Sequence, residues 1–212
     1  MRAIVAAGGD PLDEIWHTAL PDDALIVAAD SGLAHVYALG RTPHVVVGDF
    51  DSVDPAHLDR ATRDGARIDR HSTDKDATDL ELALEVARQL GATEVIVIGT
   101  GGGRLDHFLS SLTLLAAPEW AEMRITAFAG PARVTVVHDH STVAGRVDSV
   151  VTLLAVGGIA TGVTTVGLRW TLTDDELAPT STRGVSNEIV HSPASITVRA
   201  GTLLVIQPTG GR

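Results

Sequence analysis

Residues 78–99 read TDLELALEVARQLGATEVIVIG, and this stretch shows how the first half of the chain is built. Its apolar residues recur at helical spacing, which predicts a helix over Asp79–Leu90 with one apolar face. Thr78 and Glu81 have the spacing of a capping box at the start of this helix, and a glycine follows its end. The apolar run Glu94–Ile98 then predicts a buried strand. A helix followed at once by a buried strand indicates an α/β fold.

The same alternation of strand and helix continues on both sides of this stretch. Further strands are expected at Arg2–Ala7, Leu25–Ala29, His44–Val47, Arg67–Arg70 and Arg124–Ala129. Further helices are expected at Ser31–Leu39, Pro55–Thr62 and Leu105–Ala116. This order implies a mainly parallel sheet with helices on both faces. We therefore expect residues 1–130 to form a Rossmann-like α/β/α domain.

The pattern changes after about residue 130, where no helical stripe is found. Short apolar runs separated by Gly, Pro, Ser and Asp predict strands at Val134–Val137, Val150–Leu154, Thr164–Leu168, Ile196–Val198 and Leu203–Ile206. Residues 131–212 are accordingly expected to form an all-β domain, a small sandwich or barrel. The predicted fold class is α/β followed by all-β.

Composition excludes several classes of function. The chain has no cysteine, which removes disulfides, thiolate catalysis and cysteine-based metal sites. Its net charge of −11 has the wrong sign for binding the phosphate backbone of nucleic acid, so no nucleic-acid partner is expected. The uncharged stretch Ser149–Leu168 is long enough for a membrane span, but its glycines and threonines favour short strands. We expect a cytoplasmic protein that does not enter a membrane.

Acidic residues follow four successive predicted strands. They are Asp30, then Asp49 and Asp51, then Asp74, Asp76 and Asp79, and finally Asp106. The carboxyl ends of parallel strands meet at one edge of a sheet, where ligands bind. A single aspartate such as Asp79 is often only a favourable first-turn residue of a helix. Two carboxylates in a D-x-D pair, however, can present hard oxygens to one Mg²⁺ that also binds phosphate. The repeated placement predicts metal–phosphate chemistry.

A glycine-rich loop joins the strand Glu94–Ile98 to the helix that follows it. Residues 99–107 read GTGGGRLDH. Glycines between a strand and a helix let backbone N–H groups point at phosphate oxygens, although a flexible turn has the same composition. Arg104 could clamp a phosphate with two hydrogen bonds, and Lys75, the only lysine of the chain, could add a point charge. His107 could hydrogen-bond to the loop.

A second polar cluster lies in the all-β part, where residues 167–170 read GLRW and residues 181–188 read STRGVSNE. Hydroxyl and amide groups suit hydrogen bonding to a small heterocycle, and Trp170 could stack on such a ring or face a cation. Taken alone, the second segment is more typical of a polar surface loop.

Together these motifs resemble those of the thiamine pyrophosphokinase family. The matching motifs are DSG at 30–32, GDFDS at 48–52, DATDL at 76–80 and GGRLDH at 102–107, followed by the GLRW and STRGVSNE segments. The resemblance implies an α/β catalytic domain, a β-sandwich that binds thiamine, and a homodimer with active sites at the subunit interface. It also implies Mg²⁺-dependent transfer of pyrophosphate from ATP to thiamine, which gives thiamine diphosphate and AMP.

The resemblance assigns roles to particular residues. It implies Asp49, Asp51 and Asp76 or Asp79 as metal and phosphate carboxylates, with catalysis at these positions. It implies a nucleotide site that includes Arg104 and Asp106, and we assign Asp30, Lys75, Gly102, Gly103 and His107 to the same site. It implies a thiamine site at Ser186 and Asn187, and Trp170 is a substitute candidate for the aromatic residue sometimes seen just after Ser-Asn in the family. Two alternatives stay open: a phosphotransferase that acts on a different heterocyclic alcohol, and a non-catalytic module that binds a nucleotide or vitamin.

Overall fold

A computed structural model of the chain describes residues 1–209. The chain divides into two compact units, and each is described by itself. The first unit contains residues 1–111 and 125–130, and the second contains residues 112–124 together with the chain from Pro131 onward. The strands of the chain include both parallel and antiparallel pairs.

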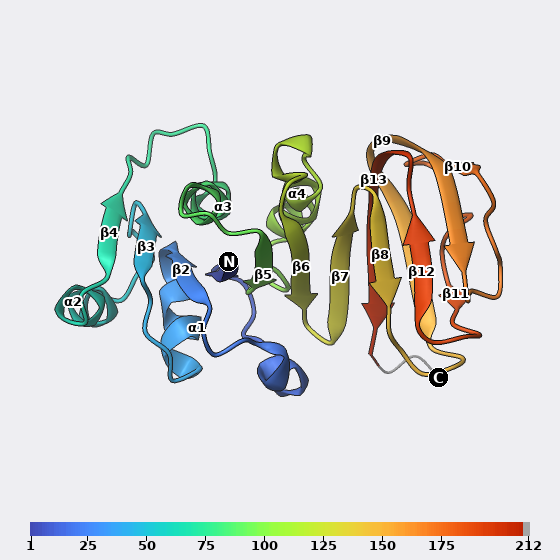
Figure 1. Ribbon diagram of the computed structural model, residues 1–212. Coiled ribbons are helices and arrows are strands. Elements are labelled where there is room, and N and C mark those ends of the chain that lie inside the picture. The colour runs from blue at the N-terminus through green and yellow to red at the C-terminus, as the bar shows by residue number, and fades with distance from the viewer. Residues whose placement is uncertain (210–212) are drawn as a thin grey trace. The chain divides into compact units, whose positions relative to one another are not determined.

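The first unit is built on a sheet with the strand order β4-β3-β2-β1-β5-β6 (Figure 1). The strands are β1 (Arg2–Ala6), β2 (Leu25–Ala29), β3 (Val45–Gly48), β4 (Arg67–Arg70), β5 (Glu94–Ile98) and β6 (Arg124–Ala129). All four pairings among β1 to β5 are parallel. In β1, Ala6 lies opposite both Ala28 of β2 and Ile98 of β5. The carboxyl ends of these strands are therefore level with one another, and the segments that follow them start from one edge of the sheet.

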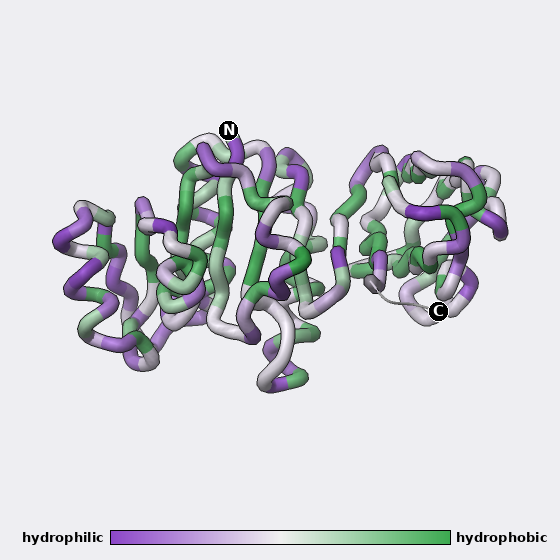
Figure 2. Tube along the Cα trace, turned by 90° about the horizontal axis from the view of Figure 1, so that it is seen from below, coloured by the Kyte–Doolittle hydropathy of each residue, from purple (hydrophilic) through white to green (hydrophobic). Residues whose placement is uncertain are grey.

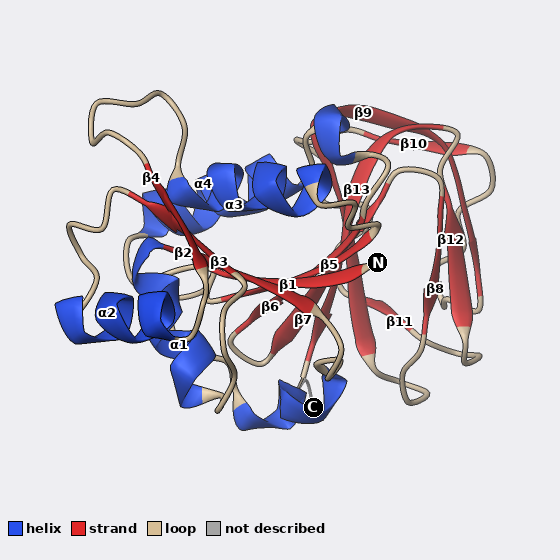
Figure 3. Ribbon diagram, turned by 60° about the vertical axis from the view of Figure 1, so that its left-hand side comes forward, coloured by secondary structure: helices blue, strands red, loops and turns tan. Residues whose placement is uncertain are grey.

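Helices cover both faces of this sheet, with α1 and α2 on one face and α3 on the other (Figure 3). The helices of the chain are α1 (Leu33–Ala38), α2 (Pro55–Arg63), α3 (Asp79–Gln89) and α4 (Leu105–Leu115), with short 3₁₀ turns at Glu14–Ala19, Asp30–Gly32 and Pro118–Trp120. The last turn and the end of α4 belong to the second unit. The cap of α3 forms as expected, because the Thr78 hydroxyl accepts a hydrogen bond of 3.3 Å from the Glu81 N–H. The apolar face of α3 packs on β1, β2 and β3.

The core of the first unit is made of small aliphatic side chains. Hydrophobic residues lie mainly along the strands, whereas the helices and loops carry most of the hydrophilic ones (Figure 2). Val27, Ala28 and Val46 are completely buried. Gly32 lies so close to the Ala6 carbonyl oxygen that a Cβ at this position would overlap it. The 3₁₀ turn after β2 can therefore pass directly over the end of β1, which places Asp30 at the edge of the sheet.

The second unit contains antiparallel strands in the order β7-β13-β9-β12-β8, and β10 and β11 also pair with β9. The strands are β7 (Ala132–Val137), β8 (His140–Val143), β9 (Val150–Val166), β10 (Asp175–Leu177), β11 (Asn187–Glu188), β12 (Ala194–Thr197) and β13 (Ala200–Pro208). A cluster of buried aliphatic residues, among them Leu153, Ile189 and Leu203, fills its core.

The strand β9 corrects one expectation. Val150–Leu154 and Thr164–Leu168 were predicted to be separate strands, but one strand runs from Val150 to Val166. Gly157 and Gly158 do not form a turn. They lie where the register against β13 shifts between Ala200 and Thr202, so the strand bulges and continues. A glycine pair indicates a break in regular pairing, and sequence alone does not distinguish a bulge from a turn.

Within residues 1–209, none of the helices has the length and apolar character that crossing a membrane would need. The uncharged stretch Ser149–Leu168 lies largely within β9.

Candidate active site

The carboxyl edge of the parallel strands gathers most of the acidic and glycine-rich motifs. Asp30 follows β2, and Asp49 and Asp51 follow β3. The segment 71–78 follows β4, and the glycine loop 99–104 follows β5. Segments far apart in the sequence thus leave the sheet at the same edge, as the strand pairing requires.

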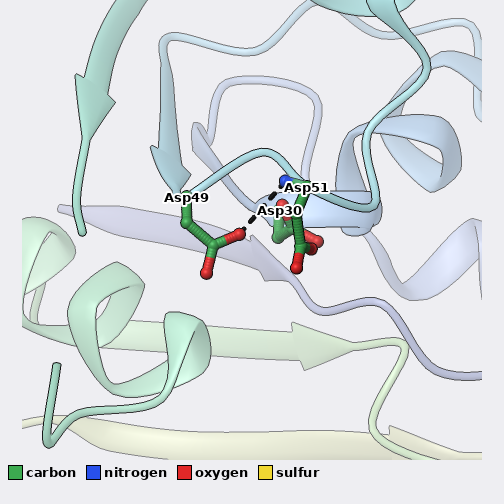
Figure 4. A group of neighbouring side chains, drawn as sticks. All are labelled: Asp30, Asp49 and Asp51. Carbon is green, nitrogen blue, oxygen red and sulfur yellow. Dashed lines mark hydrogen bonds between the residues drawn. The ribbon is translucent and has the colours of Figure 1, made fainter. Parts of the chain in front are cut away.

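Three carboxylates come together at this edge. One ligand oxygen each from Asp30, Asp49 and Asp51 can be chosen so that all three lie within 4.8 Å of one another. The three carboxylates point to the same side of the turn that follows β3 (Figure 4). Asp30 is only 8% exposed, and its Oδ1 atom is buried without a hydrogen-bond partner. Buried polar atoms are normally paired, so this oxygen lacks a partner that a cation would supply.

The turn 49–51 has an unusual backbone. Phe50 has a φ of 66°, in the left-handed region that non-glycine residues seldom adopt. The Asp51 N–H donates a hydrogen bond of 3.1 Å to Asp49 Oδ1, which closes the turn on itself. The Ser52 hydroxyl donates to Asp51 Oδ1 at 2.8 Å. Neither of these two hydrogen bonds uses Asp49 Oδ2 or Asp51 Oδ2.

Lys75 is held between two of the acidic side chains. Its Nζ donates hydrogen bonds to Asp49 Oδ2 at 3.2 Å and to Asp79 Oδ1 at 2.8 Å. Burial alone would lower the pKa of Lys75, but the hydrogen bonds and charges of Asp79 and Asp49 outweigh that effect and raise it. The ammonium is therefore charged at neutral pH and offsets part of the negative charge at this edge.

Asp30 and Asp49 respond to their surroundings in opposite directions. Burial raises the pKa of Asp30, and the charges of Asp79, Asp49 and Asp51 add to the rise. The hydrogen bond from the Asp51 N–H, together with Lys75, lowers the pKa of Asp49. Of these two carboxylates, Asp30 is thus the one whose surroundings disfavour its charge.

The donor set fits Mg²⁺. This ion prefers carboxylate oxygens, takes one or two of them from the protein and fills its other positions with water and phosphate. Asp49 and Asp51 can supply direct oxygens, and Asp30, which has one buried oxygen without a partner, belongs to the same group. The predicted third carboxylate, Asp76, is exposed and does not belong to this group. Its role as a metal ligand stays a prediction.

The glycine loop is anchored to a segment that the sequence analysis did not assign to the site. The Gly9 and Asp10 N–H groups donate to the carbonyls of Gly99 and Gly101, both at 2.7 Å. The carboxylate of Asp10 lies against Gly102, so a Cβ on this glycine would overlap it. Asp10 follows β1 as the other aspartates follow their strands, and the same strand-end rule could have found it.

The loop has the open geometry expected from its glycines. Gly102 and Gly103 have φ values of 72° and 62°, a backbone conformation that residues with a side chain seldom adopt. Arg104 and Asp106 are exposed and form an ion pair of 2.5 Å. The hydrogen bond from Arg104 lowers the pKa of Asp106 to about 2. His107 is exposed, and its carbonyl accepts a hydrogen bond from the Ser110 hydroxyl at 3.1 Å.

In the second unit, the amide of Asn187 holds the backbone of Trp170. The Trp170 N–H donates to Asn187 Oδ1 at 3.1 Å, and Asn187 Nδ2 donates to the Trp170 carbonyl at 2.8 Å. Asn187 is buried, whereas the Trp170 side chain is 54% exposed. Ser186 is also exposed and has a φ of 56°. The arrangement therefore presents Trp170 and Ser186 outward on a segment that Asn187 supports.

Two family models match the chain. The first, described as the thiamin pyrophosphokinase catalytic domain, covers residues 16–127. The second, described as the thiamin pyrophosphokinase vitamin B1 binding domain, covers residues 140–203. This chain belongs to the thiamin pyrophosphokinase family. The family predicted from the motifs is thus confirmed, and its two models match in the order in which the chain presents those motifs.

Individual relatives extend over the whole chain. A curated thiamine pyrophosphokinase of Bacillus subtilis is 24% identical over 99% of this chain and 100% of its own length. The crystal structure of a B. subtilis thiamine pyrophosphokinase covers both chains completely at 23% identity, with a TM-score of 0.86. That of a thiamin pyrophosphokinase from Geobacillus thermodenitrificans is 26% identical, with a TM-score of 0.83, and covers 100% of this chain and 99% of its own. These structures support the family fold across both units.

The buried charge of Asp30 leads to a stability prediction. Asp30→Asn should stabilise the metal-free chain at pH 7 by about 1 kcal/mol, because it removes a buried charge that faces other carboxylates. Asparagine also tolerates the positive φ at this position. The raised pKa means that the folded state already holds Asp30 protonated at low pH. The gain should therefore shrink as the pH falls through that pKa.

Urea unfolding of the metal-free chain between pH 4 and pH 8 measures this gain. The exposed helix residue Asp59 provides a matched control, and Asp59→Asn should change the unfolding free energy by less than about 0.5 kcal/mol. A destabilised Asp30→Asn variant at pH 7 would contradict the view that Asp30 is a strained buried charge.

Proposed function

We propose that this chain catalyses the transfer of pyrophosphate from ATP to thiamine, giving thiamine diphosphate and AMP. The observation that carries the proposal is the carboxylate group Asp30, Asp49 and Asp51 at the end of β2 and β3, in a chain that belongs to the thiamin pyrophosphokinase family. The family model named for vitamin B1 binding supports thiamine as the acceptor. In finer detail, we propose a Rossmann-like catalytic domain over residues 1–130 and a thiamine-binding β-sandwich over residues 131–212.

Asp49 and Asp51, with Asp30 beside them, would hold Mg²⁺. The bound ion would neutralise charge on the phosphate oxygens of ATP. The protein's own residues do the remaining work of alignment and charge balance, which dominates phosphoryl-group transfer. Asp76 and Asp79 keep their predicted places among the catalytic carboxylates, and Asp76 is the candidate for orienting the attacking hydroxyl of thiamine.

Two basic side chains, those of Arg104 and Lys75, are the proposed contacts of the ATP phosphates. Arg104 uses Nε and Nη2 on Asp106, which leaves the other donors of its guanidinium open to solvent and to a phosphate. Lys75 lies against Asp49 and Asp79 and can add positive charge next to the carboxylate group. Gly102 and Gly103, together with His107, form the proposed nucleotide loop. The magnesium requirement and the cytoplasmic location stay predictions.

The basic test is release of AMP from ATP with and without thiamine. The proposed reaction requires AMP release that depends on thiamine and on Mg²⁺. Release with another heterocyclic alcohol but not with thiamine would favour the alternative acceptor. Binding of both ligands without AMP release would favour a non-catalytic module.

The carboxylate pair provides a direct test of the catalytic role. Asp49→Asn and Asp51→Asn keep the side-chain shape but remove charge, so kcat should fall by at least about 10²-fold. Asp59→Asn is the control and should retain wild-type turnover, since Asp59 lies on the exposed side of α2. Near-wild-type AMP release from both site variants would overturn the assignment.

The Trp170 segment provides a test of the acceptor site. Trp170→Ala should raise KM for thiamine about tenfold without changing KM for ATP, because the exposed ring can stack on the cationic heterocycle. Asn187→Ala should have the same effect on thiamine and should also destabilise the fold, since it leaves the Trp170 N–H and carbonyl without partners. Ile159→Ala, at another exposed position of the second unit, is the control. An increase in KM for ATP alone would reverse the assignment.

The family resemblance further implies a homodimer whose sites use both chains, and we include this in the proposal. A chain inactivated by Asp49→Asn and a chain weakened by Asn187→Ala can be unfolded and refolded together, and activity measured at a thiamine concentration far below KM, where Asn187→Ala alone has only about one tenth of wild-type activity. Random pairing makes half of the dimers mixed, with one intact site in each, so activity should recover to roughly one quarter of wild type. Mixed dimers that form but stay inactive would show that each site belongs to a single chain.

A further inference from the structure

Arg70 makes two contacts with the turn that carries the D-x-D pair. It is the last residue of β4 and lies opposite Gly48, the last residue of β3. Its Nη1 donates a hydrogen bond of 3.0 Å to the carbonyl oxygen of Asp49. Its guanidinium carbon lies 4.6 Å from the centre of the Phe50 ring. The side chain thus crosses from one strand to the turn after the neighbouring strand.

These two contacts are to the Asp49 carbonyl and to the ring of Phe50, the residue whose backbone turns the chain between the two carboxylates. Phe50 separates Asp49 from Asp51, and its φ of 66° turns the backbone between them. A non-glycine residue keeps this conformation only where its surroundings hold it there. The ring of Phe50 is 9% exposed and belongs to the core of the first unit. Arg70 contacts the same ring and the carbonyl just before it.

We infer that Arg70 is a positioning residue, which holds the turn 49–51 in the shape that directs Asp49 and Asp51 onto one divalent ion. The inference rests on the proposed role of these two carboxylates. The hydrogen bond from Arg70 goes to a backbone carbonyl and not to either carboxylate. Arg70 can therefore support the turn without occupying an oxygen that a metal ion would need.

The positive charge of Arg70 has the opposite effect on metal binding. A guanidinium near the carboxylates repels a divalent cation. If charge were the only effect, removing Arg70 would therefore strengthen metal binding. Because Arg70 is exposed, solvent and salt weaken this repulsion. Loss of the turn geometry should dominate, since removing a residue that orients metal ligands typically weakens metal affinity by roughly 10- to 100-fold. The sign of the change separates the two effects.

The experiment measures Mn²⁺ binding to the metal-free chain by electron paramagnetic resonance, without nucleotide or thiamine. Arg70→Met keeps an unbranched stem but removes the charge and the donors, and Kd for Mn²⁺ should rise roughly tenfold. Arg70→Lys can still donate to the Asp49 carbonyl but lacks the planar group over Phe50, so Kd should rise by a smaller factor. Arg67→Met is the matched control, because Arg67 lies on the same strand and pairs with Asp69 at 2.6 Å. It should leave Kd within about twofold of wild type.

Turnover provides a second readout. The Mg²⁺ concentration for half-maximal activity should rise in Arg70→Met by the same factor as Kd for Mn²⁺, while KM for thiamine at saturating Mg²⁺ stays unchanged. Circular dichroism confirms that each variant is folded, and if Arg70→Met does not fold, Arg70→Lys decides by the same criterion.

The outcomes separate this inference from the proposed function. A wild-type chain that binds no Mn²⁺ would overturn the metal role and the inference with it. A wild type that binds Mn²⁺, with unchanged or tighter binding in Arg70→Met, would overturn only the positioning role of Arg70.

Discussion

Repulsion between like charges is the constraint around which the first unit is organised. Asp30, Asp49 and Asp51 place carboxylate oxygens within 4.8 Å of one another, and Asp30 also has a buried oxygen without a partner. Such an arrangement forms only where the backbone leaves the side chains no better position. Two parallel strands in register supply that backbone, because the residues after β2 and β3 must emerge side by side. Lys75 relieves part of this repulsion through its ion pairs with Asp49 and Asp79.

Much of this edge could be predicted from the sequence, because its signals are local. The apolar runs indicated β2, β3 and β5, and an aspartate or a glycine loop after each run indicated a residue at the edge of the sheet. The residues that support the edge could not be predicted in this way. Arg70 reads as one of several exposed arginines, and only the register of β4 against β3 brings it to the Asp49 carbonyl. Asp30 likewise gives no local sign that it would be buried.

The second unit shows a different limit of sequence analysis. Ser186 and Asn187 were predicted as neighbours with a shared role at the thiamine site. In the structure, Asn187 is buried and holds the backbone of Trp170, while Ser186 is exposed. Ser186 lies in the turn before β11 and has a φ of 56°, whereas Asn187 is the first residue of β11, so the two neighbours have different surroundings. The pairing of residues 187 and 170 joins segments 17 positions apart, and the residue types alone do not indicate it.

Lys75 has a practical consequence for handling the protein. It is the only lysine among 212 residues, so amine-directed dyes, crosslinkers and resins have one side chain to attack, at the carboxyl edge of the sheet. The amino group of Met1 is the other available amine. Immobilisation through lysine would tether the protein at its own site. The same isolation makes Lys75 a reporter, because peptide mapping can assign a mass increment to Lys75 or to Met1 and so show whether the edge is shielded from the reagent.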